Sequence, residues 1–209
     1  MWGTPETFSQ WAAKTHAQLI AREAADVPCG TCTACCRASQ FIHIEEGEEA
    51  FAAIPQALRV AAPGSPGVQI MGHDENGHCP MLVDDACSIY AKRPIACRAY
   101  DCRIFSAAGV FPDKTQPEIA SRARQWHFSP ASNDGNTVAD DGHEATKKAA
   151  GFLKQHQQAL FGAVVNEIQL SLSAPKIHHL FVSNVGLPNV EQPNVEQPNV
   201  EQIKAILRP

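Results

Sequence analysis

Four of the chain's eight cysteines lie in one eight-residue stretch, CGTCTACC, from Cys29 to Cys36. Cys29, Cys32 and Cys35 follow a C-x2-C-x2-C spacing, which lets a looping backbone turn successive sulfurs toward one centre, as in bacterial iron–sulfur proteins. Cys36 directly follows Cys35, and neighbouring side chains diverge in most backbone conformations. We therefore expect Cys35 and Cys36 to serve two metal centres, or two atoms of one cluster.

A second group of four cysteines follows in the block HCPMLVDDACSIYAKRPIACRAYDC: Cys79, Cys87, Cys97 and Cys102. No cysteine lies outside the two groups, and eight thiols is the number that two four-thiolate sites use. Such a site around a divalent ion has a formal charge of about minus two, which is costly to bury without nearby cations. Four arginines beside or between the cysteines are candidates for this support: Arg37, Arg93, Arg98 and Arg103.

Disulfides and redox chemistry are the two alternatives to metal binding. Disulfides form in oxidising compartments, and the first residues, MWGTPETFSQWAAK, show neither the basic start nor the apolar run of a secretory signal. We therefore expect a cytoplasmic protein with reduced thiols. The stretch CGTC is similar to a thioredoxin-type C-x-x-C, but the overlapping CTAC and the missing strand before it favour metal binding.

The sequence leaves the identity of the metal open between iron and zinc, since all-sulfur ligation suits both. Zinc sites usually combine two C-x2-C pairs, whereas seven, nine and four residues separate the cysteines of the second group. Cys79-Pro80 is similar to the Cys-Pro ending of ferredoxin-type runs. These features favour iron, as an iron–sulfur cluster, over zinc. His78 and His43 are weaker ligand candidates, because a lone histidine is more often a surface or packed residue.

Short elements are predicted around the cysteines. A helix capped by Thr4 should present Phe8 and Trp11 on one face and stop before Pro28. Strands are predicted at 41–45 and 68–72, with a helix at 45–62 that Pro55 splits. The second group should contain a hairpin turning at Asp84 and Asp85, then a helical turn starting at Arg93-Pro94 that carries Cys97.

The rest of the chain divides into helices, a loop and a repeat. Helices are predicted at 115–128 and 143–172, with a polar loop between them. The C-terminus contains three copies of PNVEQ, starting at Pro188, Pro193 and Pro198. Proline at every fifth position stops a helix, so we predict a flexible tail, with a partner-binding peptide as the alternative. The predicted segments are: an N-terminal helix at 1–26, a cysteine-cluster domain with an inserted helix at 27–128, a polar loop and amphipathic helix at 129–173, and the tail at 174–209.

Composition excludes several classes of partner. The 209-residue chain has a net charge of −5 and shows no Lys/Arg run with interleaved aromatic residues, so nucleic acid is not expected as a partner. Its longest apolar stretches, such as ALFGAVV, are far shorter than the roughly 20 residues that a transmembrane helix needs. We therefore expect no membrane span.

The stretch CGTCTACC, followed by CP and by CSIYAKRPIACRAYDC, resembles the YkgJ-type cysteine-cluster family (CxxCxxCC), a zinc- or iron-chelating domain. The resemblance covers about residues 27–103. It implies that metal is bound by eight cysteines: Cys29, Cys32, Cys35, Cys36, Cys79, Cys87, Cys97 and Cys102. Some longer relatives are flagellin lysine methylases, but this chain shows no glycine-rich strand-to-helix turn for S-adenosylmethionine.

We predict a mainly helical α+β protein whose small cysteine-rich core contains a short β-hairpin. Its predicted function is to bind a metal ion: iron, as an iron–sulfur cluster, or zinc. The alternative is an iron–sulfur-dependent redox or methyl-transfer enzyme related to lysine N-methylases. The sequence identifies no catalytic residues, no substrate and no protein partner.

Overall fold

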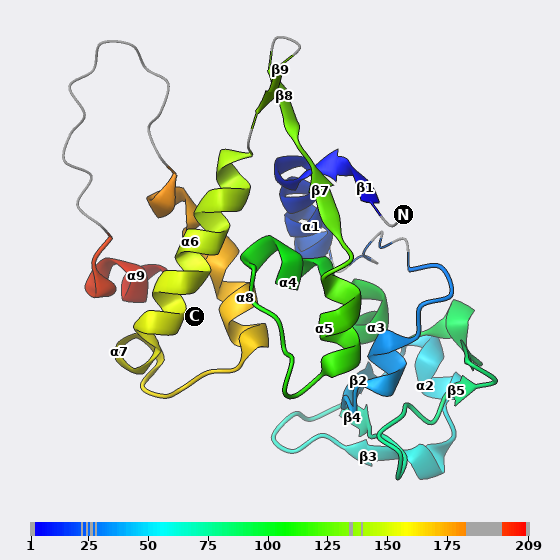
Figure 1. The fold of residues 1–209 in the computed structure, drawn as a ribbon. Helices are drawn as coiled ribbons and strands as arrows, with labels where there is room; N and C mark the ends of the chain where they lie inside the picture. Colours follow the sequence, from blue (N-terminus) through cyan, green and yellow to red (C-terminus); the bar gives the residue numbers. More distant parts are fainter. Residues whose placement is uncertain are drawn as a thin grey trace, which may run out of the picture. The chain divides into compact units, whose positions relative to one another are not determined.

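The computed structural model describes residues 3–21, 23, 25, 27, 29–133, 136–138, 140–182 and 198–207. Contacts between residues divide the chain into two compact units. Unit 1 comprises Met1–Ala13, Cys102–Pro112 and Ala123–Pro209, and unit 2 comprises Lys14–Asp101 and Asp113–Arg122. The elements are mostly helices with a few short strands, which confirms the predicted α+β class (Figure 1).

The elements of unit 2 are all short except for the end of helix α1 (Phe8–Ala21), which begins in unit 1. In chain order they are η1 (Ala34–Arg37), β2 (Ile42–Glu45), α2 (Glu49–Ala53), η2 (Gln56–Leu58), β3 (Arg59–Ala61), β4 (Val68–Met71), β5 (Leu82–Val83), β6 (Ala86–Cys87), η3 (Tyr90–Lys92), α3 (Ile95–Ala99) and most of α5 (Pro117–Ala123).

A three-stranded antiparallel sheet, in the order β2-β4-β3, forms the centre of unit 2. It buries Ile44 and Met71 together with Ile54, and Cys79 packs against this core. Both predicted strands are confirmed. The helix predicted at 45–62 is split at Pro55, as expected, and its last part is strand β3, because Val60 pairs with Ile70 in the sheet.

The predicted hairpin at Asp84 and Asp85 is also confirmed. Strands β5 and β6 pair antiparallel, with Leu82 opposite Cys87. Asp84 and Asp85 have φ of 48° and 58°, the left-handed backbone that a two-residue hairpin turn of this kind requires. Aspartate tolerates this conformation better than most residues, because its short side chain bonds locally to the backbone.

Unit 1 is mainly helical. In chain order it contains β1 (Gly3–Thr7), the start of α1, α4 (Arg103–Ala108), β7 (His127–Ser129), β8 (Ala131–Asn133), β9 (Asn136–Val138), α6 (Asp141–Gln155), α7 (Gln157–Phe161), α8 (Glu167–Ile177), η4 (His178–Phe181) and α9 (Val200–Leu207). Helices α4, α6 and α8 pack together and bury Leu153, Leu170 and Ile177 (Figure 1). A second, smaller core forms around Phe8 and Trp11.

The first helix starts later than predicted. Residues 3–7 form β1, which pairs parallel to β7, and α1 begins at Phe8 rather than after Thr4. The Thr7 hydroxyl accepts from the backbone N–H of Gln10 at 3.3 Å, and the Gln10 side chain accepts from the N–H of Thr7 at 3.0 Å. This reciprocal arrangement is a capping box, which fixes the helix start at Thr7.

The helix predicted at 143–172 is interrupted. Helix α7 ends at Gly162, whose φ of 72° is left-handed, and Asn166 then caps α8 by accepting from the N–H of Gln169 at 2.9 Å. Because of the break, Leu153 before it is buried, whereas Val164 after it is 78% exposed.

The C-terminal end also differs from the predicted tail. Helix α8 continues to Ile177, and residues 200–207 form helix α9, whose Ile203 is fully buried in the core of unit 1. The Asn199 side chain caps α9 by accepting from the N–H of Gln202 at 2.8 Å. The first two PNVEQ copies lie outside the described residues. The third, starting at Pro198, leads directly into α9 because the proline precedes the helix and does not interrupt it.

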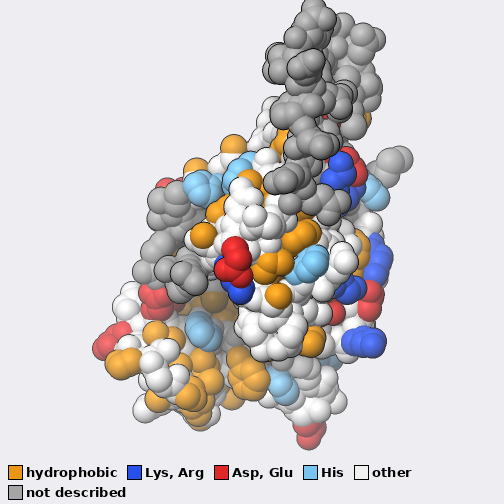
Figure 2. Space-filling model, turned by 90° about the vertical axis from the view of Figure 1, so that its left-hand side faces the viewer, with side chains coloured by type: hydrophobic (Ala, Val, Ile, Leu, Met, Phe, Trp, Pro, Cys, Tyr) orange, Lys and Arg blue, Asp and Glu red, His pale blue; other side chains and the backbone are white. Residues whose placement is uncertain are grey.

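No helix in the described parts of the chain combines the length and the apolar character that a membrane span requires. Hydrophobic side chains are nevertheless exposed between polar ones on one face of the molecule (Figure 2). On α9, Ile206 is 36% exposed, in contrast to the buried Ile203 three residues earlier.

We predict that Ile203→Ala lowers the free energy of unfolding by about 2–4 kcal/mol, because it removes a buried side chain and leaves a cavity. Ile206→Ala is the matched control on the same helix and should cost less than about 1 kcal/mol. Guanidinium denaturation followed by circular dichroism measures both. Equal losses for the two variants would show that α9 does not contribute to the core.

Candidate metal centre

The two cysteine groups are joined directly through their backbones. The N–H of Cys79 donates to the carbonyl of Cys36 at 2.7 Å. Three residues beyond Cys36, the N–H and the hydroxyl of Ser39 both donate to the carbonyl of Gly77, at 2.9 and 3.2 Å. Residues 36–39 and 77–79 therefore run side by side, so a residue of the first cysteine group is hydrogen-bonded to a residue of the second.

Gly77 is required at this junction for two reasons. Its φ is 79°, a backbone conformation that side chains disfavour. A Cβ at this position would also lie 2.3 Å from the Ser39 hydroxyl oxygen, far inside van der Waals contact. The turn that leads into Gly77 is held by Asp74, whose side chain accepts from the N–H groups of Asn76 and His78.

The hairpin and α3 position the next two cysteines. Cys87 lies on β6 opposite Leu82, and the N–H of Leu82 donates to the carbonyl of Cys79 at 2.9 Å. Cys97 lies in α3, which follows Arg93-Pro94 as predicted. The Glu48 carboxylate accepts from the N–H of Ile95 at 2.6 Å, so an anion satisfies a free donor at the start of this helix.

Electrostatic coupling shows which thiols lie near one another. Burial and, to a smaller extent, the thiolates of Cys79 and Cys87 together raise the pKa of Cys36 to about 11. The pKa of Cys97 is raised to about 12, mainly by burial and then by the thiolates of Cys79, Cys36 and Cys87. The pKa of Cys79 is also raised, first by burial and also by the Cys87 thiolate. We call these four side chains the four-thiol group: Cys36, Cys79, Cys87 and Cys97.

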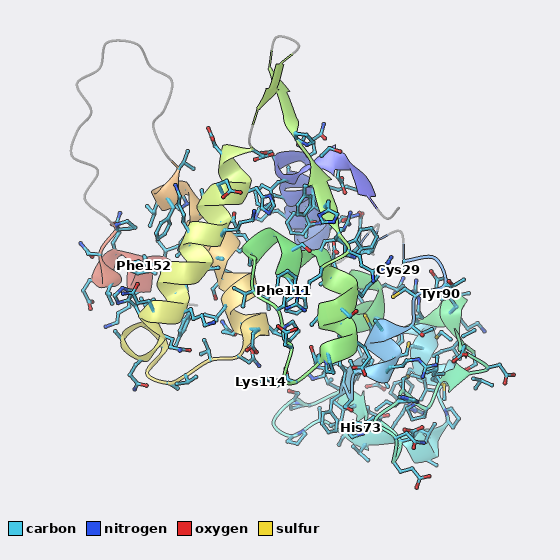
Figure 3. The ribbon with its side chains drawn as sticks, in the orientation of Figure 1. Cys29, His73, Tyr90, Phe111, Lys114 and Phe152 are labelled. Carbon is cyan, nitrogen blue, oxygen red and sulfur yellow. The ribbon has the colours of Figure 1, made fainter. Side chains whose placement is uncertain are left out.

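Cys29 and Cys32 lie at the start of the cysteine-rich segment (Figure 3 labels Cys29), and the charge of Cys32 also raises the pKa of Cys36 in the four-thiol group. The N–H of Cys32 donates to the carbonyl of Cys29 at 3.0 Å. Burial raises the pKa of Cys29, and the charges of Cys32 and Asp101 add to this, whereas Arg122 and Arg93 lower it. Cys35 is half-buried in η1, one residue before Cys36.

Cys102, the last predicted ligand, belongs to unit 1. Its side chain is buried, and its sulfur accepts a hydrogen bond from the indole N–H of Trp126 at 3.2 Å. Hydrogen bonds from N–H groups to sulfur stabilise a thiolate, and sulfurs that bind metal commonly accept them. No sequence pattern indicates Trp126 as part of a site.

The four arginines near the cysteines have different roles. The positive charge of Arg93 lowers the pKa values of Cys29, Cys36 and Cys97, so it lies within reach of both thiol groups. Its guanidinium stacks on the Tyr90 ring at 3.8 Å and donates to the Tyr90 carbonyl at 3.0 Å, which fixes its position.

Two of the other arginines form ion pairs with carboxylates. Arg37 pairs with Asp85 in the hairpin turn, and in unit 1 the buried Arg103 pairs with Glu6 at 2.6 Å. The interaction found for Arg98 involves its backbone: its carbonyl accepts a hydrogen bond from the N–H of Ala25 at 2.7 Å, which links α3 to the segment before Cys29.

Thiol ligands suit zinc and iron equally well in their chemistry. Within the described residues, however, no three side chains of His, Cys, Asp or Glu are close enough together to hold a metal ion. The thiols must therefore move closer together to bind one. Four mutually coupled thiols with an arginine beside them supply the soft ligands and the compensating charge that zinc and iron–sulfur sites use. The sequence-based candidate His43 is exposed on β2.

Three residues that support the site were not identified from the sequence: Ser39, Glu48 and Gly77. Their contacts join segments separated by 38 and 47 positions, so no local pattern indicates them.

Comparison with known families identifies the cysteine-rich segment. Residues 28–124 match the family model CxxCxxCC, described as "Putative zinc- or iron-chelating domain". The matched residues include all eight cysteines. No curated protein and no solved structure matches the chain.

We predict that Gly77→Ala reduces the metal retained by the purified protein, because the new methyl group displaces the Ser39 hydroxyl and breaks its hydrogen bond to the carbonyl of residue 77, which weakens the junction. Gly67→Ala is the matched control. Gly67 has a similar φ of 77° but open space around it, so it shares the backbone strain without the collision. Elemental analysis after dialysis against a chelator measures the difference. Equal retention by the two variants would refute the role of this junction.

We also predict that the metal-free protein loses stability as pH rises from about 9 toward 12. Folding raises the pKa values of Cys36 to about 11 and Cys97 to about 12, from 9.0. The folded state therefore favours the neutral thiols, and their stabilising contribution is complete below pH 9 and is lost as pH passes through the raised values.

Denaturation midpoints of chelator-treated protein at about pH 8 and pH 11 test this second prediction. A variant carrying both Cys36→Ala and Cys97→Ala is the control, since lysine and tyrosine side chains also titrate in this range. It should show a smaller loss. An identical loss in both proteins would contradict the assignment.

Proposed function

Since residues 28–124 belong to the CxxCxxCC family, we propose that the protein binds zinc or iron through the thiols of this domain, and that the four-thiol group forms one metal site. The observation that carries the proposal is the mutual coupling of Cys36 in η1, Cys79 in the segment before β5, Cys87 in β6 and Cys97 in α3. Because these ligands come from separate segments, metal binding would join four parts of unit 2 together.

The surroundings of the group support this role. Metal ligation requires thiolates, and the raised pKa values of Cys36 and Cys97 mean that these thiols are protonated at neutral pH without metal. Zinc or iron therefore competes with protons, and each bound ion releases them. Arg93 offsets part of the negative charge that then accumulates, while its stacking on Tyr90 keeps it in place.

The remaining cysteines are proposed as further ligands. The charge of Cys32 raises the pKa of Cys29, so these two thiols are electrostatically coupled. Adjacent side chains diverge, so we propose that Cys35 and Cys36 bind different metal centres or different atoms of one cluster. The hydrogen bond from Trp126 is the kind that supports a metal-bound Cys102 thiolate. Iron, as a cluster, remains our preferred metal on the spacing of the cysteines, with zinc as the alternative.

Anaerobic purification, elemental analysis and a visible absorption spectrum test the function. An iron–sulfur protein should be brown, with broad visible absorption and acid-labile sulfide, whereas a zinc protein should be colourless. Either result supports metal binding and identifies the metal. Folded protein that contains neither metal and takes up neither one on addition would refute the proposal.

We predict that Cys97→Ser loses the metal of the four-thiol group and lowers the midpoint of thermal unfolding, because a hydroxyl is a poor replacement for a thiolate ligand. Ala96→Ser places the same hydroxyl one position earlier on α3 and should retain the wild-type metal content. Elemental analysis of the two variants, purified in parallel, measures the effect. Full metal content in Cys97→Ser would show that Cys97 is not a ligand.

A further inference from the structure

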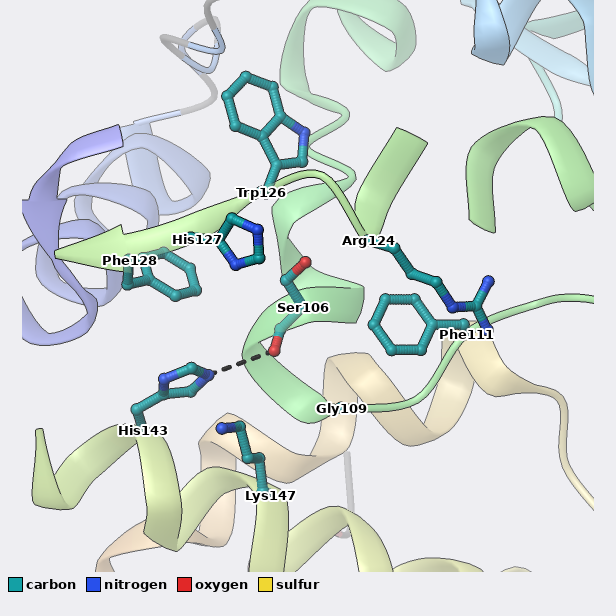
Figure 4. Close-up of a pocket in the computed structure, with 9 residues that line it drawn as sticks. All are labelled: Ser106, Gly109, Phe111, Arg124, Trp126, His127, Phe128, His143 and Lys147. Atoms are coloured by element: carbon teal, nitrogen blue, oxygen red, sulfur yellow. Dashed lines mark hydrogen bonds between the residues drawn. The ribbon is translucent and has the colours of Figure 1, made fainter. Parts of the chain in front are cut away.

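Unit 1 contains a pocket of about 490 Å³, within the usual size range of small-molecule sites. Residues of α4 and α6 line it, together with the segments that follow α4 and α5 (Figure 4). No carboxylate is among the described residues of its wall, whose aromatic part consists of Phe111, Trp126, His127, Phe128 and His143. A wall of this composition suits a flat apolar ring.

Two side chains of α6 reach the end of α4 at the wall of this pocket. His143 and Lys147 are one helical turn apart, and Figure 4 shows both projecting toward Ser106. Nε2 of His143 lies 3.2 Å from the Ser106 carbonyl, and because a carbonyl only accepts, this nitrogen carries the hydrogen. The stem of Lys147 packs over Gly109, since a Cβ on that glycine would lie 3.4 Å from Cγ of Lys147. Contacts with the end of α4 therefore hold both side chains in the wall.

The Lys147 ammonium keeps hydrogen-bonding capacity for a ligand. An ammonium has three N–H donors, and the Glu144 carboxylate accepts from one of them at 2.9 Å. A ligand oxygen can therefore bond to Lys147 while this ion pair stays intact. Because Glu144 offsets the charge of Lys147 and repels other anions, the position favours an uncharged acceptor, such as a carbonyl oxygen.

The aromatic wall beside Lys147 is preformed and neutral. The His143 imidazole stacks on Phe8 with ring centroids 5.1 Å apart and meets Phe128 edge-on at the same distance. Burial lowers the pKa of His143, and the positive charge of Lys147 also lowers it, so the ring is uncharged near neutral pH. This influence of Lys147 means that its ammonium lies near the imidazole. A flat group can therefore pack against this wall with an oxygen within reach of Lys147.

We propose that this pocket binds a small uncharged aromatic molecule that carries a carbonyl group. Its ring packs against Phe128 and His143, and its carbonyl oxygen accepts a hydrogen bond from Lys147. No cysteine is among the described residues of the wall, so the proposal does not depend on metal binding.

Isothermal titration of the full-length protein with benzamide tests the proposal. Benzamide should bind at least about fivefold more tightly than cyclohexanecarboxamide, which keeps the carbonyl but lacks the flat ring. It should also bind more tightly than benzylamine, in which a cation replaces the carbonyl. Benzoate should bind no more tightly than benzamide, because Glu144 lies beside Lys147.

Two substitutions on α6 separate the roles of the ion pair. Lys147→Met keeps the stem over Gly109 but removes the donors, so it should weaken benzamide binding about tenfold, the loss expected for one charge-assisted hydrogen bond. Lys154→Met, two turns further along α6, is the matched control and should leave the affinity unchanged. Glu144→Gln leaves the charge of Lys147 without its carboxylate, so benzoate should then bind more tightly than benzamide.

Three outcomes would overturn the proposal: no binding of benzamide up to about 10 mM, tighter binding of benzoate than of benzamide to the unaltered protein, or unchanged benzamide affinity in Lys147→Met. Circular dichroism shows whether Lys147→Met is folded. If it is not, Glu144→Gln decides the test, and no gain in benzoate binding would then refute the role of Lys147. Neither variant should change the metal content, so failure here is distinguishable from failure of the metal-binding function.

Discussion

The hydrogen bond between the backbones of Cys79 and Cys36 is the contact on which the rest of unit 2 depends. It joins positions 43 residues apart, and the Ser39 and Gly77 pair extends it into a continuous junction. Burial makes these thiols costly to ionise and is the main reason that their pKa values rise, and the neighbouring thiolates add to the rise. A bound cation reverses this cost, because it favours the thiolates that burial disfavours. The stability of unit 2 and the ionisation of its thiols therefore both depend on the junction between Cys36 and Cys79.

The local elements around the cysteines were largely predictable because short-range chemistry determines them. Pro55 splits a helix, Asp84 and Asp85 form a turn, and Arg93-Pro94 precedes a helical turn. The convergence of the cysteine groups was inferred from residue type alone, since soft ligands in such number rarely have another use in a reduced chain. The mutual coupling of Cys36, Cys79, Cys87 and Cys97, and the coupling of Cys32 to both Cys29 and Cys36, follow from tertiary packing, which spacing does not encode.

The errors have identifiable physical causes. Thr7 and Gln10 form a better cap than Thr4, and the signature T-x-x-Q was present in the sequence. Gly162 and Asn166 divide a helix that apolar periodicity alone makes continuous. The pocket of unit 1 had no sequence signal, because Phe111, Arg124 and Lys147 come from three segments that only the fold brings together.

Helix α9 has a consequence for the repeated segment before it. Because Ile177 and Ile203 are both buried in the core of unit 1, the described residues on either side of the repeated segment are fixed in the same unit. The entropy of closing a loop grows only with the logarithm of its length, so one more PNVEQ copy costs about 0.3 kcal/mol. Gain or loss of copies, as replication slippage would produce in a tandem repeat, is therefore almost neutral for the stability of this protein.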